Sequence, residues 1–439
     1  MTNKDKTRFF IRTFGCQMNV NDSEKIAGLL AAEGYEPAAD AAGADFIFVN
    51  TCAVREKAAD KLYHSLSRLK KVKAQRPGLR IGVGGCVAQL EGERILEKAR
   101  HVDLLVGTHT LHRVPALLRE ADGRPVVDLD RKADAFTVPD AAVAHSSPVR
   151  AYVTAIEGCN HVCSFCVVPR TRGPEVNRPP DAIVREVEAL VARGYPEVML
   201  LGQTVNAYRF GDVAFPGLLA RVNAVRGLRR LRFTTSHPEH VTPDLADALR
   251  DLDKVCPYLH LPVQSGSDRV LGSMRRGYDR RHYLAIVALL RERVRDLSLT
   301  SDIIVGYPGE TDEEFQDTVG LVQEVGFDGL FVFKYSPRPG TTALRLPDDV
   351  PEEEKSRRLR VLNDQQQRLQ RVRNEARIGR REEVLVDSVA PSGVAGRTPH
   401  FRIVHLQDAA PEILGQVVEA EITGAGPNAL VGRLTQPIH

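Results

Sequence analysis

Short apolar runs alternate with amphipathic stretches along the first third of the chain. The runs "TRFFIRTFG", "ADFIFVN" and "LRIGVGG" predict three strands, and "VDLLVG" and "RPVVDL" predict two more. Between them, "NDSEKIAGLLAAEG" predicts a helix with Asn21 or Asp22 as its N-cap and Gly34 past its end. A longer basic helix is expected from about Val54 to Gln75. This alternation predicts a parallel sheet covered by helices on both faces.

The alternation continues through the middle of the chain and changes near Arg381. Six apolar runs predict strands: "VRAYVTAIEG", "EVMLLGQ", "RRLRFTTSHP", "YLHLPVQSG", "LSLTSDIIVGYPGE" and "DGLFVFKYSP". Helical stretches such as "DAIVREVEALVARG" lie between them, so six β/α units in a partial TIM-type barrel are expected. Beyond Arg381, short runs such as "EEVLVDSVA" and "FRIVHLQD", separated by Gly and Pro, predict a small antiparallel β-barrel.

This pattern places the chain in the α/β class, with several domains in its 439 residues. We expect an N-terminal parallel-sheet α/β domain at 1–128, a linker at 129–148, a central partial (β/α)6 barrel at 149–370 and a small antiparallel barrel at 371–439. The composition, 43% hydrophobic and 27% charged, is typical of soluble globular proteins. The net charge of +3 gives no overall excess that would indicate a nucleic-acid partner.

The apolar runs and the cysteines bear on the cellular compartment. The opening "MTNKDKTRFF" lacks the apolar core of a secretory signal, and runs such as "VMLLG" are far shorter than the ~20 residues of a membrane span. Seven cysteines in a large chain of this kind favour metal binding or catalysis over a disulfide framework. We therefore expect a cytoplasmic protein with no membrane partner.

Three cysteines follow predicted strands of the first domain. Cys16 follows "IRTFG", Cys52 follows "FVNT" and Cys86 follows "GVGG". Because the carboxyl ends of parallel strands meet at one edge of a sheet, where ligands bind, these three thiols are expected to converge. The alternative is that all three are buried structural cysteines.

A second group of three cysteines has the spacing C-x₃-C-x₂-C in "EGCNHVCSFCVVPRTRG". It comprises Cys159, Cys163 and Cys166. A zinc site would need a fourth ligand, and His161, the nearest candidate, is crowded between two of the cysteines. A [4Fe–4S] cluster normally takes one thiolate per iron, so three cysteines leave one iron open for a substrate or cofactor. Phe165, just before the last cysteine, could pack over such a cluster.

Polar residues are also expected at the carboxyl ends of the barrel strands, where the active sites of such barrels lie. Some of them should bind a cofactor or the substrate, although each could equally be a loop cap or turn residue. These residues are Gln203, Asn206, Ser236, His237, Gln264, Ser265 and Asp302. Cys256, in "DKVCPYLHL", is expected to be a buried core thiol.

Two stretches carry a local excess of basic residues. Residues 355–381 contain one Lys and nine Arg against one Asp and one Glu, and residues 55–76 contain eight Lys and Arg against two acids. Most charge runs are solvated helix faces. An excess as large as that of residues 355–381 favours contacts with phosphates, and the adjoining terminal barrel is of a kind that binds RNA.

Several motifs together make the chain resemble the tRNA methylthiotransferases of the MiaB type over nearly its whole length. They are "TFGCQMNVNDSE", "NTCAVREKA", "GVGGCVAQ", "EGCNHVCSFCVVPRTRG", "TTSHP", "LPVQSGSDRVL" and "KYSPRPGT". The C-x₃-C-x₂-C motif resembles that of the radical S-adenosylmethionine (SAM) superfamily, and the C-terminal barrel resembles a TRAM domain. One position departs from the family, because Arg170 stands where members often have Tyr.

The resemblance implies a function and a set of cofactors. Such enzymes add a methylthio group to C2 of N6-isopentenyladenosine at position 37, next to the anticodon of certain tRNAs. Cys159, Cys163 and Cys166 match the ligands of the radical-SAM [4Fe–4S] cluster, whose open iron binds SAM. The resemblance further implies SAM contacts from the strand ends, for which the candidates are Gln203, Asn206, Ser236, Gln264 and Asp302.

The resemblance also assigns the other triad and the partners. Cys16, Cys52 and Cys86 match the ligands of a second [4Fe–4S] cluster, which supplies the open iron for sulfur. One SAM would methylate sulfur there, and another would yield the radical that removes hydrogen from C2 of the adenine. A radical route suits an sp² C–H bond that has no acidic proton. The implied partners are the anticodon stem-loop of tRNA and an external one-electron donor such as flavodoxin or ferredoxin, with the protein a monomer.

Other functions stay open at this point. Sister enzymes modify threonylcarbamoyladenosine in tRNA or an aspartate of a ribosomal protein, but "CQMN" after the first strand favours the MiaB type. A ferredoxin-type electron carrier would have four cysteines per cluster, which two sets of three do not provide. A non-catalytic RNA-binding module with structural metal would leave the polar strand ends of the barrel unexplained.

Overall fold

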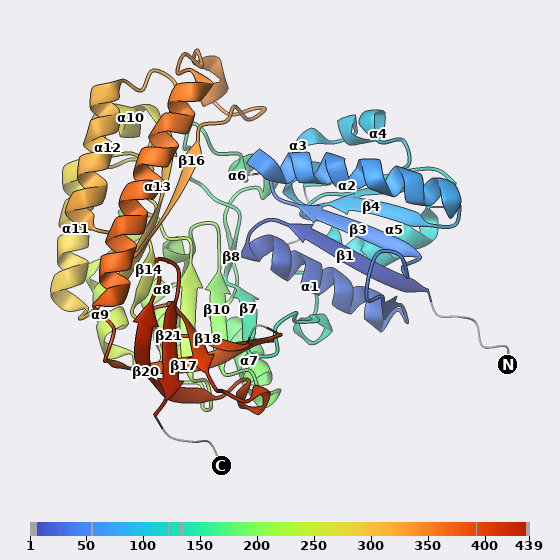
Figure 1. The fold of residues 1–439 in the computed structure, drawn as a ribbon. Helices are drawn as coiled ribbons and strands as arrows, with labels where there is room; N and C mark the ends of the chain where they lie inside the picture. Colours follow the sequence, from blue (N-terminus) through green and yellow to red (C-terminus); the bar gives the residue numbers. More distant parts are fainter. Residues whose placement is uncertain (1–6, 54–55, 122, 132–135, 392, 436–439) are drawn as a thin grey trace.

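A computed structural model describes residues 7–53, 56–121, 123–131, 136–391 and 393–435. Figure 1 shows an α/β lobe in blue, a larger lobe in green to orange and a small red barrel beneath the larger lobe. Helices of the larger lobe cover the outside of its strands. None of the described helices combines the length and the apolar character needed to cross a membrane.

The N-terminal lobe is a parallel sheet of six strands in the order β2-β1-β3-β4-β5-β6. The strands are β1 (Arg8–Phe14), β2 (Glu36–Pro37), β3 (Phe46–Thr51), β4 (Arg80–Gly84), β5 (Leu104–Val106) and β6 (Val126–Asp128). The helices are α1 (Gln17–Ala32), α2 (Glu56–Gln75), α3 (Cys86–Glu91), α4 (Arg94–Lys98) and α5 (Val114–Glu120). The predicted parallel α/β domain is therefore confirmed.

Helix α1 begins earlier than the sequence predicted. Its N-cap is Cys16, and the expected caps Asn21 and Asp22 lie inside the helix. Their side chains are buried in contacts with the middle lobe, so they are not available to cap a helix end. The expected start of the next helix at Val54 and Arg55 lies outside the described residues, as do residues 132–135 of the expected linker.

The middle lobe contains six parallel β/α units, which confirms the predicted partial barrel. The strands are β7 (Arg150–Thr154), β10 (Glu197–Leu201), β13 (Arg230–Thr234), β14 (Tyr258–His260), β15 (Ser298–Val305) and β16 (Gly329–Lys334). They form two ladders, β13-β10-β7 and β14-β15-β16. The ladders are joined where Leu231 bridges Val255 and where Ser236 N–H donates to the His260 carbonyl.

Helices cover the outer face of these strands and form the largest core with them. They are α7 (Pro180–Ala192), α8 (Phe215–Asn223), α9 (Pro243–Asp251), α10 (Asp268–Ser273), α11 (Arg280–Arg293), α12 (Asp312–Val325) and α13 (Glu352–Glu375). Shorter elements are β8 (Ile156–Glu157), α6 (Val168–Thr171), β9 (Val176–Asn177), β11 (Arg209–Phe210) and β12 (Val213–Ala214). Single 3₁₀ turns lie at Leu111–Arg113, Asp140–Ala142, Val205–Ala207, Pro238–His240, Ala343–Arg345 and Pro411–Ile413.

The C-terminal lobe is a closed barrel in the order β17-β18-β19-β21-β20. Its strands are β17 (Arg381–Ala390), β18 (Gly393–Arg397), β19 (Ile403–Gln407), β20 (Val417–Ala425) and β21 (Leu430–Leu434). The predicted barrel is confirmed, but it is not wholly antiparallel. The β19–β21 pair is parallel, because β20 lies on the other side of β21 and the chain returns beside β19 in the same direction.

The C-terminal barrel packs against the closed end of the middle lobe. The ring of Phe401 lies over the guanidinium groups of Arg232 and Arg150, at 4.7 Å and 5.3 Å, and beside Tyr258 at 4.9 Å. Arg232 also donates to the Thr398 and Pro399 carbonyls at 2.8 Å. These contacts fill the amino-terminal end of the partial barrel, opposite the carboxyl strand ends where the active sites of such barrels lie.

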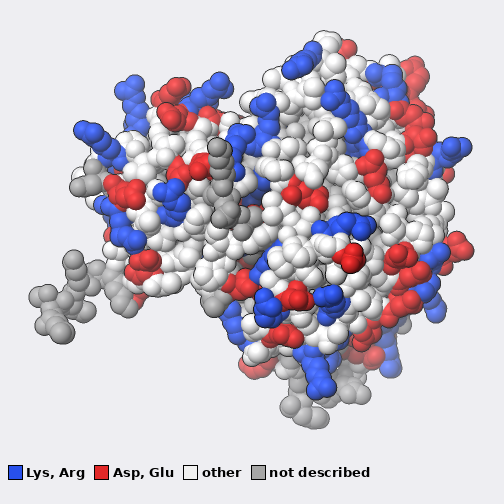
Figure 2. Space-filling view, turned by 180° about the vertical axis from the view of Figure 1, so that it is seen from behind, with Lys and Arg blue, Asp and Glu red and all other residues white. Residues whose placement is uncertain are grey.

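The basic run of residues 355–381 is largely compensated in three dimensions. Most of its cations form ion pairs with acids outside the run. The pairs are Lys355–Asp348, Arg357–Asp312, Arg358–Glu310, Arg373–Asp328, Arg377–Asp296 and Arg381–Glu419. The local charge counted along the sequence therefore overstates the positive surface, and Figure 2 shows basic and acidic side chains interspersed on the face it displays. Arg360, Arg368 and Arg371 on α13 are exposed and have no ion pair within the described chain.

A buried carboxylate joins the strands to the terminal barrel and gives a test of this packing. Glu197 is fully buried and pairs with Arg150 and Arg232. Burial alone would raise the pKa of Glu197, but Arg232 and Arg150 lower it to about 2. The pair therefore stabilises the fold fully above pH 4.5, the ordinary pKa, and its contribution is lost as the pH falls toward 2.

We expect Glu197→Gln to lower the stability by roughly 3–5 kcal/mol, because it leaves two buried guanidinium groups without their carboxylate. The readout is the thermal midpoint at pH 7. The matched control is Glu33→Gln, which removes an exposed pair with Arg119 and should cost less than ~1 kcal/mol. Equal midpoints for the two variants would contradict the structural role of Glu197.

Candidate active site

The first cysteine triad lies at the carboxyl edge of the N-terminal sheet. Cys16 caps α1 just after β1, Cys52 directly follows β3, and Cys86 is the first residue of α3 after β4. Since β1, β3 and β4 are neighbours in the sheet, the three thiols emerge at adjacent strand ends. The fold therefore places side by side three residues that are far apart in the sequence.

A buried arginine lies among these thiols. The pKa of Cys16 is lowered to about 6, mainly by a hydrogen bond with the Cys52 thiol and also by the charge of Arg172, while burial opposes both. Burial disfavours the charge of Arg172 as well, but Asp22 and then Cys86 raise the pKa of Arg172 well above its ordinary value. The site is therefore arranged to hold anionic sulfur beside a fixed positive charge.

The second triad lies on the loop between β8 and α6. Burial raises the pKa of Cys166 to about 12, and the nearby Cys163 and Cys159 oppose its ionisation further. The Cys166 N–H donates to the Cys163 carbonyl at 3.1 Å, and the Val168 N–H donates to the Cys166 sulfur at 3.4 Å. None of the seven cysteines forms a disulfide. Three thiols on one loop, with Cys159 buried and Cys163 and Cys166 half-buried, are a soft donor set suited to an iron–sulfur centre.

Arg276 stabilises this second triad. The guanidinium group is buried and donates through Nη1 to the Cys163 sulfur at 3.2 Å. Its remaining donors are held by the Tyr278 hydroxyl at 3.0 Å and by the Pro262 carbonyl at 3.1 Å. These contacts fix a positive charge next to the thiolate that a metal ligand must become.

One short segment, residues 166–172, connects the two triads, and we call it the bridging segment. Val167, next to Cys166, packs in the core of the N-terminal lobe with Cys86. The Thr171 carbonyl accepts a hydrogen bond from Thr108 of the N-terminal lobe. At its end, Arg172 donates to both carboxylate oxygens of Asp22. The loop that carries the second triad is thereby anchored in the domain that carries the first.

The start of α1 also faces the barrel. Met18 is buried against Met199 and Leu201 of β10, and Cys16 packs at the edge of the same cluster. The Asn21 amide donates to the Tyr152 carbonyl at 3.3 Å, and its oxygen accepts from Thr154 at 2.9 Å. Cys16 of the first triad therefore lies close to β7 and β10 of the middle lobe.

Polar residues predicted at the strand ends fall into two groups. The Gln203 Oε1, Ser236 Oγ and His237 Nε2 atoms are buried and have no hydrogen-bond partner within the described residues. Buried polar atoms are normally paired, so these three indicate a place where a polar ligand completes the site. Asn206 and Ser265, in contrast, bond to neighbouring backbone and hydroxyl groups and hold their loops.

Two of these loops adopt a backbone conformation that favours glycine. Gln264, after β14, has φ 79°, and Thr235, after β13, has φ 67°. Such conformations cost ~1–3 kcal/mol and persist mainly where a site requires them. Asp302, on β15, lies nearby, with a carboxylate oxygen 3.4 Å from the His260 ring, and its main-chain carbonyl accepts from the Gln264 N–H.

A group of histidines lies beside the second triad. His161 stacks on His237 with ring centres 4.0 Å apart, and its Nε2 lies 3.0 Å from Nε2 of His240. Nδ1 of both His161 and His237 lies 3.4 Å from a Glu239 oxygen, and the three side chains are close enough to share a metal ion. Burial lowers the pKa of His161 to about 4 and that of His237 further, so both rings are neutral at pH 7.

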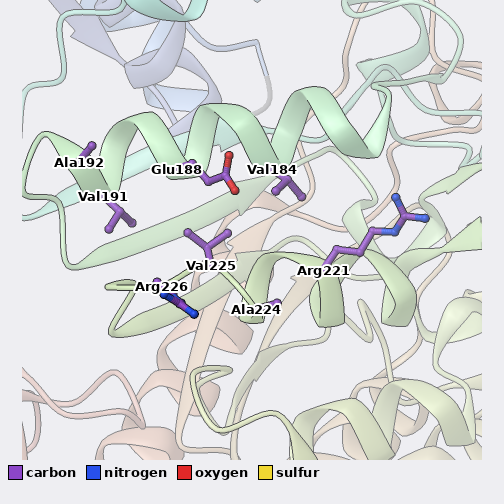
Figure 3. A pocket seen from close by; sticks show the side chains of 8 residues that line it. All are labelled: Val184, Glu188, Val191, Ala192, Arg221, Ala224, Val225 and Arg226. Carbon is purple, nitrogen blue, oxygen red and sulfur yellow. The ribbon is translucent and has the colours of Figure 1, made fainter.

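An open groove of about 500 Å³ lies elsewhere, between α7 and the end of α8 (Figure 3). Its lining consists of short aliphatic side chains together with Glu188, Arg221 and Arg226. It lies on the helical outside of the middle lobe and brings none of the predicted site residues together. We therefore do not assign chemistry to it.

The sequence analysis missed several residues that shape the site. Arg172 and Arg276 carry no spacing signal of their own, because their partners Asp22 and Cys163 are more than 100 residues away. Arg170, the departure from the family pattern, is exposed and lies against Gly340, where an added Cβ would come within 2.0 Å of its guanidinium group. Cys256 is buried, as predicted.

Comparison with known families and proteins agrees with this geometry. Residues 8–107 match the family model described as "Uncharacterized protein family UPF0004", and residues 153–322 match that of the radical SAM superfamily. A protein of Geobacter sulfurreducens is 44% identical over 97% of both chains. One of Neisseria gonorrhoeae is 44% identical over 98% of this chain and 99% of the relative. Each is named tRNA-2-methylthio-N(6)-dimethylallyladenosine synthase.

Solved structures share much of this fold. The radical SAM methyltransferase TsrM of Kitasatospora setae matches with a TM-score of 0.54 and 15% identity, covering 77% of both chains. The cobalamin-dependent radical SAM enzyme OxsB matches with a TM-score of 0.54 and 12% identity, covering 82% of this chain and 55% of the other. At these identities the likeness concerns the fold alone.

The bridging segment yields a prediction about the contact between the lobes. Asp22→Asn leaves Arg172 buried without a charged partner, so we expect the segment to exchange its amide hydrogens faster. The readout is hydrogen exchange of peptides that cover residues 166–172 and 17–24. Lys25→Gln, which removes a longer pair with Glu157 at 3.7 Å, is the control and should change the exchange little. Unchanged exchange in Asp22→Asn would show that this ion pair does not anchor the segment.

Proposed function

The chain belongs to the family of tRNA-2-methylthio-N(6)-dimethylallyladenosine synthases, and from this premise we propose how its residues serve that activity. The reaction adds a methylthio group to C2 of N6-dimethylallyladenosine, also called N6-isopentenyladenosine, at position 37 of tRNA. The main observation that supports this activity for the chain's own residues is the bridging segment. It joins the two cysteine triads near the carboxyl ends of the strands. A transfer between a sulfur site and a radical site requires such a junction.

We propose that Cys159, Cys163 and Cys166 hold a [4Fe–4S] cluster. The donor set fits this group, because the three thiols form no disulfide and lie on one loop, with Arg276 positioned to stabilise thiolate charge. When bound, such a cluster with one open iron supplies the electron for reductive cleavage of SAM. The three unpartnered polar atoms of Gln203, Ser236 and His237 support SAM binding at the neighbouring strand ends.

The other SAM candidates contribute differently in this proposal. Gln264 has a strained backbone conformation, and the side chain of Asp302 is partly exposed. A polar ligand at the carboxyl ends of the strands would be within their reach. Asn206 bonds to both main-chain groups of His237, so its part is to hold the loop that presents His237 and Ser236. In this arrangement the backbone of the loop is set before SAM arrives.

We propose that Cys16, Cys52 and Cys86 hold a second [4Fe–4S] cluster. Their fit rests on the same donor chemistry, on the contact between Cys16 and Cys52, and on the charge of Arg172 beside Cys16 and Cys86. Arg172 would neutralise part of the negative charge that thiolates and bound sulfur bring into a buried place. Met18 packs on Met199 and Leu201, so the surroundings of Cys16 are partly apolar.

We propose that the anticodon stem-loop of tRNA binds across the carboxyl ends of the strands of the middle lobe. Contacts with the C-terminal barrel and with α13 would supply the affinity. Exposed Arg360, Arg368 and Arg371 repeat at spacings of eight and three residues, which places them on one face of that helix. Single-stranded loop bases can be splayed out and read individually, unlike paired bases. Exposed Arg170 would add a further phosphate contact close to the second triad.

The remaining parts of the proposal concern partners and location. An external one-electron donor such as flavodoxin or ferredoxin would reduce the enzyme, which would act as a monomer in the cytoplasm, where tRNA is modified. The sister activities on threonylcarbamoyladenosine or on a ribosomal aspartate are disfavoured, because the relatives that match over nearly the full length carry the dimethylallyladenosine name. Mass spectrometry of nucleosides from tRNA treated with the reconstituted enzyme tests this choice.

The two-cluster proposal predicts a division of iron between the triads. Anaerobically reconstituted protein should hold about eight iron and eight sulfide ions, and Cys159/Cys163/Cys166→Ala about half of each. Cys16/Cys52/Cys86→Ala should lose the other half but retain reductive SAM cleavage while it forms no methylthio product. Cys256→Ala is the control and should keep the full iron content. Normal product formation by the Cys16/Cys52/Cys86 variant would refute the second-cluster assignment.

The tRNA proposal predicts a charge-specific loss of binding. Arg360→Gln/Arg368→Gln/Arg371→Gln should weaken tRNA binding and lower the slope of log Kd against log salt by about two to three, since each lost phosphate contact removes ~0.9 from that slope. Filter retention across a salt series measures this slope. Arg357→Gln is the control, because Arg357 is already paired with Asp312 and Glu354. An unchanged slope in the triple variant would exclude this helix face.

A further inference from the structure

Strand β16, the last of the partial barrel, has two faces in different environments. On the outer face, Leu330 and Val332 pack in the core that also contains Leu362 of α13, and Figure 1 shows α13 running beside β16. On the inner face, the rings of Phe331 and Phe333 are 54% and 39% exposed. Successive side chains of a strand point to opposite sides, so both rings belong to the face turned away from α13.

This inner face adjoins the predicted site. In the parallel ladder Phe331 is in register with Asp302, and Phe333 is in register with Ile304. The His260 ring meets Phe331 edge to face with centres 6.0 Å apart, and the same ring lies 3.4 Å from an Asp302 oxygen. Two apolar rings therefore lie next to a His–Asp pair that can donate and accept hydrogen bonds. We call Phe331 and Phe333 the aromatic shelf.

The aromatic shelf is continuous with the second cysteine triad. Ile304, in register with Phe333, packs in one cluster with Phe165, Tyr307 and Tyr335. Phe165 immediately precedes Cys166 in the triad loop. A ligand lying on the shelf would thus be a short distance along one apolar surface from the place where a radical would be generated.

No described element covers the shelf. β16 is the edge strand of its ladder, and α13 occupies only the outer face. Neighbouring aromatic rings left exposed inside a barrel mark a surface that binds something flat and apolar. The substrate named for the relatives has that chemistry, since it is an adenine base that carries a dimethylallyl chain.

We propose that Phe331 and Phe333 bind the N6-alkylated adenine base after it leaves the stack of the anticodon loop, with His260 meeting a ring nitrogen. The proposal rests on the proposed function and adds the residues that recognise the substrate. Stacking on aromatic side chains compensates for the stacking that a splayed base gives up, and an alkyl chain on the second ring adds apolar burial.

The alternative occupants are the adenine of SAM and a second copy of the chain. The unpartnered polar atoms of Gln203, Ser236 and His237 lie at the ends of β10 and β13, on the opposite ladder from β16. They would bind the polar part of SAM away from Phe331 and Phe333, which leaves the two rings available to the RNA base. A protein–protein interface would need a much larger apolar area than two rings.

Fluorescence of an introduced tryptophan tests which ligand occupies the aromatic shelf. The signal would come from that residue alone, because the chain contains no Trp. Phe331→Trp in the full-length reconstituted enzyme should lose emission when an anticodon stem-loop RNA with N6-dimethylallyladenosine is added. Val127→Trp, at an exposed position on the edge strand β6, is the control and should not respond. Quenching of Phe331→Trp by SAM alone, or self-association of the enzyme through this face in sedimentation, would overturn the proposal.

Steady-state kinetics provide the second test. Phe331→Ala and Phe333→Ala should each raise the KM for the alkylated stem-loop about tenfold, within the range reported for losing one base–aromatic stack. Phe331→Leu should recover part of the loss, while Val127→Ala should have no effect. SAM cleavage without RNA should stay within about twofold of the wild type in every variant.

The outcomes separate this inference from the function on which it rests. A wild-type enzyme that forms no methylthiolated nucleoside would refute the proposed function. A wild-type enzyme that forms the product, together with Phe331→Ala and Phe333→Ala variants of unchanged KM, would refute the aromatic shelf alone. Loss of discrimination between alkylated and unmodified stem-loops in the Phe333→Ala variant would support it.

Discussion

The buried ion pair between Arg172 and Asp22 is the contact on which the arrangement of the site depends. A guanidinium group taken out of water is costly unless a carboxylate meets it in good geometry, and Asp22 accepts from both of its terminal nitrogens. Because Arg172 lies six residues after Cys166 and Asp22 lies six residues after Cys16, this one pair couples the positions of the two triads. Val167 strengthens the coupling by packing in the core beside Cys86.

The two ends of the barrel strands differ. At the amino-terminal end, Phe401 covers the guanidinium group of Arg232, and Arg232 pairs with the buried Glu197. At the carboxyl ends the same fold leaves polar atoms unpartnered, holds Gln264 in an unfavourable backbone conformation and exposes Phe331. Unpaired polar groups beside strained backbone, at the strand ends where barrels of this kind bind ligands, are typical of a site before its ligands arrive.

Much of the fold and of the candidate site could be predicted from the sequence. The physical reasons for this also explain why other parts could not be predicted. Cys16, Cys52 and Cys86 were predictable because apolar runs mark strands and a parallel sheet gathers strand ends at one edge. The start of α1 was placed too late, because Asn21 and Asp22 resemble caps but serve contacts with another lobe. Strand β18 was missed because its Gly and Ala residues give no strand signal. The charge counted along residues 355–381 overestimated the positive surface, because the ion-pair partners of that run come from distant segments.

The central claim is that the two cysteine triads form one site held by the bridging segment. Electron paramagnetic resonance of the reduced, reconstituted enzyme tests it most directly, because two paramagnetic clusters held close together perturb each other's spectra. We expect the spectrum of the full enzyme to show this spin coupling, and the separate spectra of the two triple-cysteine variants to lack it. A full-enzyme spectrum equal to the sum of the two variant spectra would contradict the account.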